Sequence, residues 1–150
     1  MEPQNPNYLA QVRQIFKQAP FIAELGIELQ DLGPGWCQTT LKVLPKHYQQ
    51  DRFVHAGVQA TMADHTAGAA TAGLIKPSEI VLTVEFKINL LRPAMGQELS
   101  CRAKVLRPGR SLHVVESEVF ARSGNQEKMT AKAMVTIAVV PAPDQAAKAA

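Results

Sequence analysis

The sequence lacks features that mark several common classes of protein. Only 2 of its 150 residues are cysteines, Cys37 and Cys101, and they lie in separate apolar segments without the spacing of metal ligands or redox pairs. Two buried thiols are therefore expected, with no disulfide framework and no metal site. No run of five or six like charges occurs, and the net charge of +3 is spread along the chain. This distribution disfavours nucleic acid as a partner and weakly favours a phosphorylated ligand.

The chain also lacks a secretory leader and a membrane span. Its first residues include an acid and prolines but no apolar core of the kind that a signal peptide needs, so a cytoplasmic location is expected. Residues 56–74 approach the length of a span, yet Gln59, Asp64, His65 and three threonines make insertion into lipid costly. We therefore expect no contact with a membrane.

Residues 56–74 are instead rich in alanine, glycine and threonine, and Asp64 is their only formal charge. A helix with such small and apolar side chains all round is typical of one that other elements wrap on most sides. A carboxylate buried there is costly unless it is paired, neutralised or put to use. We therefore expect a functional role for Asp64, the alternative being a structural carboxylate that caps a neighbouring loop.

The composition, 46% hydrophobic and 19% charged, is typical of one domain, which we expect over residues 1–140. Apolar residues at helical spacing predict a lead-in helix over residues 7–18, stopped by Pro20. An apolar approach and a first strand follow, and a GPG turn leads to a second strand that ends at about Leu44. Residues 141–150 are expected to form a disordered tail.

Beyond Pro77 the pattern changes to the alternation of apolar and polar residues that is typical of strands. The first of these strands is expected to direct one apolar row toward the helix, formed by Ile80, Leu82, Val84, Phe86, Ile88 and Leu90. Three further strands with one apolar face each follow. An antiparallel sheet of five or six strands around one long central helix is the α+β hotdog architecture, which is the fold we expect.

Three segments resemble the hotdog thioesterases of the PaaI-like group. They are HAGVQATMAD at 55–64, VEFKINLLRPAMGQEL at 84–99 and GRSLHVVESEV at 109–119, in the order and spacing of that family. The resemblance covers roughly residues 20–140, nearly the whole domain. It implies an enzyme, an acyl-CoA thioesterase that hydrolyses the thioester without a metal or a cofactor.

The resemblance also implies roles for individual residues. Asp64 matches the catalytic carboxylate, acting as nucleophile or as the base that activates water. Ala56 and Gly57 stand where family members have two glycines and where a backbone amide polarises the thioester carbonyl, so the amides of both residues are expected to be oxyanion donors. His55 matches the residue that steadies that loop. Thr83 matches a hydroxyl that positions the water. Strict alternation, however, places Thr83 on the polar face, away from the helix, unless a bulge or a subunit edge turns it.

Four further residues are candidates for substrate binding. Gln49 and Gln50 lie in the neighbourhood where the family often has an asparagine, about six residues before the histidine. Arg92 and Arg110 flank turns, where they can meet the phosphates of CoA. Solvated arginines at strand ends are equally common.

The spacing of Ala56 and Asp64 predicts a dimer. Eight residues of helix separate their backbones by about 12 Å, although both groups must lie close to one carbonyl. One helix cannot provide both, whereas an antiparallel helix from a second subunit can bring its own Asp64 to the first subunit's Ala56. We expect a homodimer with two shared sites, which can pair further into a homotetramer.

Two other functions remain open from the sequence. One is a hotdog dehydratase or hydratase that acts on acyl-CoA, and the other is a non-catalytic acyl-CoA binding protein. The acyl group is not determined, nor is the choice between CoA and an acyl-carrier protein. The remaining histidines have no predicted catalytic role: His65 is expected to serve in subunit packing, and His47 and His113 are expected to be incidental.

Overall fold

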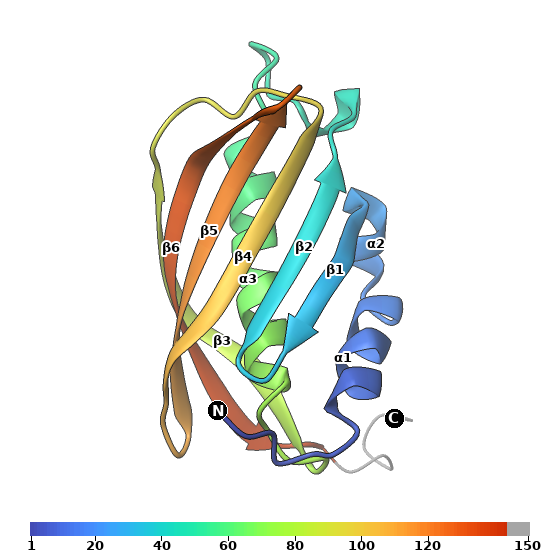
Figure 1. Ribbon diagram of the computed structural model, residues 1–150, viewed down its shortest axis with the longest axis vertical. Helices are drawn as coiled ribbons and strands as arrows, with labels where there is room; N and C mark the ends of the chain where they lie inside the picture. The colour runs from blue at the N-terminus through green and yellow to red at the C-terminus, as the bar shows by residue number, and fades with distance from the viewer. Residues whose placement is uncertain (144–150) are drawn as a thin grey trace.

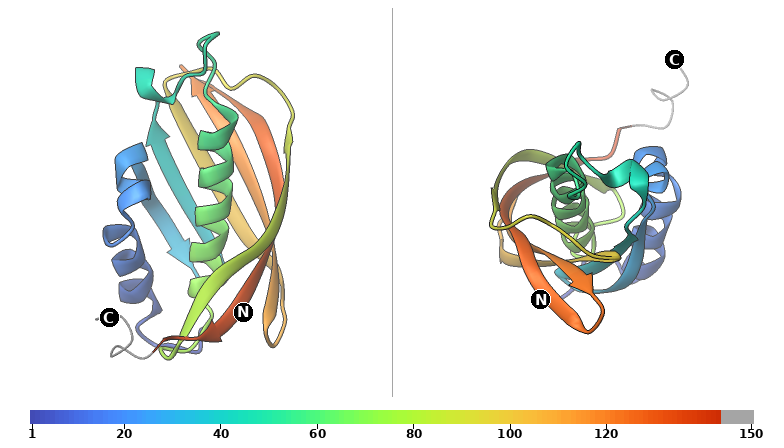
Figure 2. Two further views of the ribbon diagram at one scale, coloured as in Figure 1. Left: turned by 180° about the vertical axis from the view of Figure 1, so that it is seen from behind. Right: turned by 90° about the horizontal axis from the view of Figure 1, so that it is seen from above.

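A computed structural model describes residues 1–143, which form one antiparallel sheet curled around a long helix (Figures 1 and 2). The strand order is β1-β2-β4-β5-β6-β3, so β1 and β3 are the edges. This arrangement confirms the α+β hotdog fold. The elements are α1 (Tyr8–Lys17), α2 (Pro20–Leu25), β1 (Ile27–Gly33), β2 (Trp36–Lys42), the short 3-10 helix η1 (Pro45–His47), α3 (Ala56–Ala72), β3 (Glu79–Leu90), β4 (Glu98–Pro108), β5 (Leu112–Ser123) and β6 (Gln126–Pro141).

The central helix α3 lies in the hollow of the sheet because its side chains are small. It packs against all six strands and α1, and five of its alanines are buried. Small side chains let the backbone of the curved sheet approach the helix closely, while Met62 and Val58 fill the wider gaps. No helix formed by residues 1–143 is long and apolar enough to cross a membrane.

The alternation expected in the later strands is confirmed for β4 and β6. Four residues of each strand are fully or almost fully buried: Leu99, Cys101, Ala103 and Val105 in β4, and Ala131, Ala133, Val135 and Ile137 in β6. Both cysteines are free and buried, as expected. Burial raises the pKa of each thiol to about 12, so neither is a reactive thiolate at neutral pH.

The alternation expected in β3 is wrong, because the strand contains a bulge. Thr83 pairs with Ile137, but the next pair joins Glu85 to Thr136, so Val84 is an extra residue. An extra residue reverses which side chains face the core, since successive residues of a strand point to opposite faces. The odd-numbered residues therefore face α3 before the bulge and the even-numbered ones after it.

Much of the apolar row of β3 is exposed on both sides of the bulge. Val81 and Ile88 contact the core, one from each side of the bulge. Four other residues, Leu82, Val84, Phe86 and Leu90, are between 42% and 61% exposed. β3 is thus an edge strand with an uncovered apolar surface.

The segment expected to be an apolar approach to the first strand contains a second helix, α2. Pro20 is its first residue and Gly26 ends it in the left-handed conformation, with φ of 80°. Proline at the start and glycine just past the end are the usual signals of a helix, and here they enclose only six residues. The helix directs Ile22 into the core and leaves Phe21 exposed.

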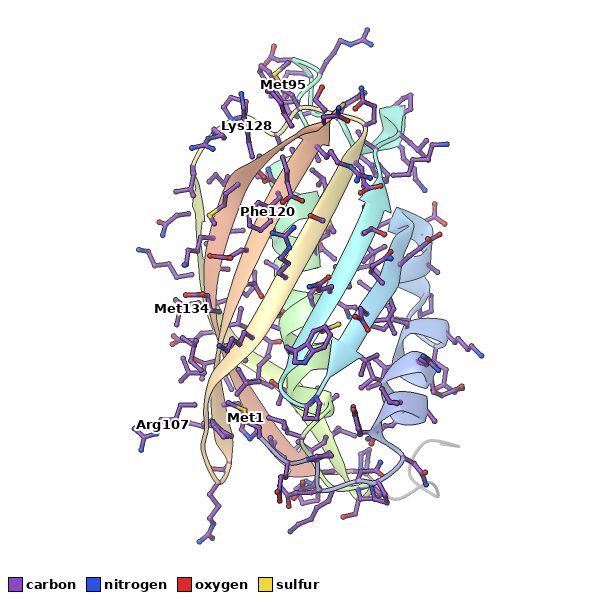
Figure 3. The ribbon with its side chains drawn as sticks, viewed as in Figure 1. Met1, Met95, Arg107, Phe120, Lys128 and Met134 are labelled. Atoms are coloured by element: carbon purple, nitrogen blue, oxygen red, sulfur yellow. The ribbon has the colours of Figure 1, made fainter. Side chains whose placement is uncertain are left out.

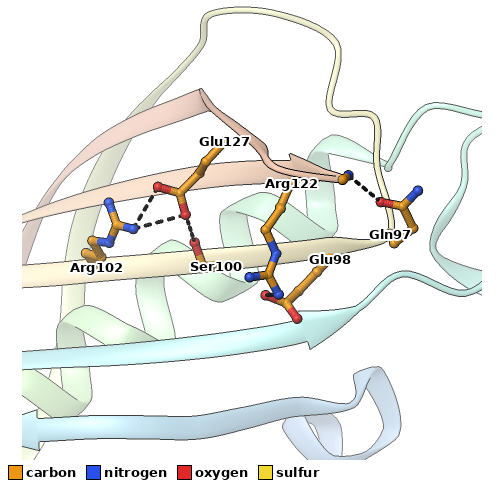
Figure 4. Close-up of polar contacts among 7 residues, drawn as sticks. Gln97, Glu98, Ser100, Arg102, Arg122 and Glu127 are labelled. Atoms are coloured by element: carbon orange, nitrogen blue, oxygen red, sulfur yellow. Dashed lines mark hydrogen bonds and ion pairs between the residues drawn. The ribbon is translucent and has the colours of Figure 1, made fainter.

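The outer face of the sheet is polar (Figure 3). Arg102 forms a two-pronged ion pair with Glu127 and Arg122 pairs with Glu98, both at 2.7 Å (Figure 4). The Arg102 guanidinium also lies 4.4 Å from the centre of the Phe120 ring. These charges are neutralised locally. The expected disordered tail begins at residue 141, but β6 runs to Pro141 and residues 144–150 lie outside the described part of the chain.

Candidate active site

The N-terminus of α3 presents one free backbone amide. His55 is the N-cap, and its Nδ1 accepts the N–H of Gly57 at 2.8 Å. The carbonyl of His55 accepts the N–H of Val58 at 3.0 Å. Ala56 is the first helical residue, and within residues 1–143 its N–H has no hydrogen-bond partner. The Gly57 amide is therefore engaged by the cap, and the Ala56 amide is available to a ligand.

Asp64 lies two turns further along α3 and is held by β3. The hydroxyl of Thr83 donates to Oδ1 of Asp64 at 2.7 Å. The contact exists because Thr83 precedes the bulge and shares the inner face of the sheet with Ile137. Strict alternation placed Thr83 on the face away from the helix, and that expectation is wrong. The bulge, which was the stated exception, is present and turns Thr83 toward Asp64. Asp64 itself is half-buried and not buried.

Asp64 lies on the one stripe of α3 that the sheet leaves open. The open stripe consists of Ala60, Thr61, Asp64, His65 and Gly68, which are all half-buried and recur at helical spacing. Seen from behind, the upper part of this helix is in open view, and β3 crosses its lower end (Figure 2). The uncovered stripe and the edge strand β3 are neighbours, because Thr83 touches Asp64.

Two hollows meet at Asp64. The larger, of about 370 Å³, is lined by Phe21, Ile22, Ala60, Thr61, Asp64, His65 and Phe86. The smaller, of about 190 Å³, is lined by Ile15, Asp64, His65, Gly68, Ala69, Val81 and Thr83. Apart from Asp64, His65 and two threonines, the lining is apolar. An acyl group therefore has an apolar surface beside the carboxylate.

His65 separates the two hollows and is packed against α1. Its ring makes an edge contact with Phe16, with centroids 4.6 Å apart. Burial lowers the pKa of His65, and the adjacent Asp64 carboxylate only partly opposes that shift. His65 is therefore neutral at pH 7. His65 therefore lines both hollows beside Asp64 as an uncharged side chain.

The two glutamines predicted to bind substrate lie in a tight loop before the helix. The side chain of Gln49 accepts the N–H of Asp51, and Gln50 donates to the Asp51 carboxylate at 3.1 Å. Arg52 in this loop has a positive φ of 66°. Both amides are thus occupied within their own loop.

The two arginines predicted to bind phosphates lie at opposite ends of the sheet. Arg92 lines a hollow of about 330 Å³ that also contains Lys128, Ser123 and Thr130. This hollow is near the start of α3, since the N–H of Val54 donates to the carbonyl of Ala94 at 3.0 Å.

Arg110 lies beyond the far end of β4, a strand whose 11 residues span about 35 Å. Figure 3 shows Lys128 at one end of the molecule and Arg107, near Arg110 in the chain, at the other. The two arginines of one subunit therefore do not contact the same phosphate group.

No cluster of metal-ligating side chains occurs within residues 1–143. The residues around Asp64 and the start of α3 offer a carboxylate, a hydroxyl and a backbone amide. Sequence reasoning missed the contributions of Phe21, Phe86 and Lys128 to these hollows. Phe21 comes from the unexpected helix α2. Phe86 faces the helix as expected, but it lines the hollow together with residues of α2. Lys128 lies on a strand that is distant in sequence.

Comparison with known proteins establishes the class. Residues 52–128 match the model of the thioesterase superfamily. A thioesterase family protein from Silicibacter pomeroyi has 34% sequence identity and a TM-score of 0.88, over 90% of this chain and 99% of that one. The chain belongs to the thioesterase superfamily and is a thioesterase, as the resemblance of its motifs predicted.

Two further proteins with named functions or pathways are similar to this chain. The 1,4-dihydroxy-2-naphthoyl-CoA hydrolase of Listeria monocytogenes is 30% identical over 115 residues, which is 77% of this chain and 91% of that protein. The PaaI protein of E. coli, from the phenylacetic acid degradation operon, has a TM-score of 0.80 over 91% of this chain and 96% of that one. At 17% identity, this second likeness establishes the shared fold.

Proposed function

We propose that this thioesterase hydrolyses an acyl-CoA to the free acid and CoA, with Asp64 as base or nucleophile and the Ala56 amide of a partner subunit as oxyanion donor. The observation that carries the proposal is the pairing of a fixed carboxylate with a free helix N-terminal amide. Thr83 fixes the carboxylate at 2.7 Å, and the Ala56 N–H is left free while Gly57 is capped.

The chemistry follows from these groups. Attack on the thioester carbonyl produces an oxyanion, which a fixed N–H at the N-terminus of α3 stabilises together with the helix dipole. Asp64 activates water or attacks directly, and the Thr83 hydroxyl holds its carboxylate toward the hollow. A thiolate is a good leaving group, so no strong general acid is required. His55 acts by capping the helix through Gly57.

Within one subunit, the Ala56 amide and the Asp64 carboxylate are too far apart to act on the same thioester carbonyl. They are eight residues apart on α3, or about 12 Å along its axis. Ala60 is the midpoint between Ala56 and Asp64. When two α3 helices run antiparallel about a two-fold axis beside Ala60, each Asp64 lies opposite the partner's Ala56. The small side chain of Ala60 on the open stripe permits this close approach.

The edge strand β3 favours the same dimer. Its outer edge has unpaired backbone groups and exposes Leu82 and Val84, at 53% and 61%. Soluble proteins rarely leave such an edge uncovered. Because Thr83 touches Asp64, a partner that covers β3 also approaches the open stripe. We infer that two copies join along β3 and the open stripe, forming two sites.

The hollow with Arg92 and Lys128 is our proposed site for the phosphates of CoA. Two cations and the hydroxyl of Ser123 are suited to phosphate, and the segment from Arg92 leads to the start of α3. The CoA thioester named for the Listeria relative also favours CoA as the carrier. Arg110 can take part only from the other subunit.

The test is release of free thiol from a panel of aliphatic and aromatic acyl-CoAs. Wild-type protein is expected to hydrolyse at least one of them, and Asp64→Asn to lower kcat by about 10²–10⁴-fold. The control is Asp31→Asn, the same change at an exposed carboxylate on β1 that accepts its neighbour's N–H. Binding of acyl-CoA without hydrolysis by the wild type would contradict the proposal and favour a non-catalytic binding protein.

A further inference from the structure

His47 joins three segments of the chain at the start of α3. It is 1% exposed, at the end of η1. Its Nδ1 accepts the N–H of Leu44 at 2.9 Å, and its Nε2 lies 2.8 Å from the carbonyl oxygen of Leu25. Because Nδ1 faces a donor and Nε2 faces an acceptor, the N–H of the ring is assigned to Nε2. Its own carbonyl accepts the N–H of His55 at 2.8 Å.

We propose that His47 is a positioning residue that sets the direction of the Ala56 N–H. The inference rests on the proposed function of that amide. The N–H of Ala56 lies in the same peptide plane as the carbonyl of His55, which is bonded to Val58. The bond from the His55 N–H to the His47 carbonyl holds the other side of the N-cap. The N-cap is thus fixed from within α3 and from outside it.

The external anchor is rigid because η1 is tied to α2. Lys46 donates to the carbonyl of Glu24, beside the bond between His47 and Leu25. The end of α2, η1 and the start of α3 therefore form one hydrogen-bonded unit. An oxyanion donor is effective only when its direction is held during the reaction, and a displacement of about 1 Å can lower the rate by about 10²-fold.

A second buried histidine provides a matched control. His113 on β5 is 4% exposed, and its Nδ1 has no partner within residues 1–143. It pairs across the strands with Pro108, at the end of β4 away from the start of α3. His113→Leu therefore removes a buried imidazole without removing a contact to the helix start.

The experiment combines kinetics with amide hydrogen exchange on the intact protein. His47→Leu is expected to lower kcat by about 10–100-fold and to change KM by less than about threefold, because the amide acts on the transition state more than on bound substrate. The His55 amide should exchange at least about tenfold faster. His47→Asn and His47→Gln, which keep an acceptor near Nδ1 or a donor near Nε2, should recover part of kcat. His113→Leu should keep wild-type kcat and His55 exchange.

Two results would overturn the inference. One is a His47→Leu protein that folds and keeps kcat within about twofold of wild type; the other is equal loss of kcat in the His47 and His113 variants. If His47→Leu does not fold, the Asn and Gln variants decide by the same measurements. Absence of hydrolysis by wild-type protein overturns the proposed function instead, and the exchange of the His55 amide alone then decides whether His47 anchors the helix start.

Discussion

Asp64 reaches a hydroxyl on the sheet because β3 carries one residue more than the strand beside it. If Val84 were instead paired in the ladder, a single alternation would run through β3, and Thr83 and Phe86 would lie on opposite faces. With the bulge, both line hollows that contain Asp64. The bulge thus allows Thr83 to hydrogen-bond the Asp64 carboxylate while Phe86 lines the apolar hollow beside it.

The contribution of the Thr83 hydroxyl can be measured by removing it alone. Thr83→Val keeps the shape of the side chain, and we expect kcat to fall by about 10–100-fold because a hydrogen bond to a charged group is worth about 1.5–3 kcal/mol. Thr83→Ser is the control and should retain most of the activity. A valine variant as active as wild type in thiol release would rule out a positioning role for this hydroxyl.

The sequence predicted the residues of the site better than their orientation. The helical segment with a single acid led to Asp64, and the small residues around it predicted a helix inside the sheet. Thr83 could not be placed, because the apolar residues of β3 continue their alternation through the bulge. The hydrogen bonds of His47 could not be predicted either, since its partners Leu25 and His55 lie in segments that only the fold brings together.

At the scale of elements, the proposed site depends on the start of α3 and on the edge strand β3. Capping by His55 and the anchor through η1 hold the Ala56 amide, while β3 holds the Asp64 carboxylate through Thr83. The antiparallel strands and the central helix were predictable from periodicity. The short helix α2 was not, because six residues are too few for a helical repeat to be recognised.

The edge of β3 is the element whose role is most directly open to mutation. We expect Val84→Lys to dissociate the proposed dimer, since a lysine on an edge strand opposes pairing with a second strand. Sedimentation velocity should show a shift from dimer to monomer, with loss of hydrolysis in proportion. Leu106→Lys is the control, because Leu106 is also exposed, at 47%, but lies on the interior strand β4. A Val84→Lys dimer of unchanged stability would exclude β3 from the interface.

At the scale of the whole molecule, one subunit contains both groups that we propose to be catalytic, Asp64 and the Ala56 amide, but cannot bring them together. The distance of about 12 Å follows from helix geometry and was available from the sequence. The structure adds the uncovered stripe on α3 and the exposed edge of β3, which favour a two-fold partner on that side. The outer face of the sheet carries its own ion pairs.

Mixing two inactive variants tests the shared site most directly. One is Asp64→Asn and the other is Ala56→Pro, which deletes the N–H at the first helical position, where proline is well tolerated. His55, with φ of −58° and ψ of 139°, already has the backbone conformation that precedes proline, so the helix should form normally. After subunit exchange at equal concentrations, about a quarter of the wild-type activity should return, since half of the dimers are mixed and each has one intact site. No recovery, with exchange verified by mass spectrometry, would contradict the account.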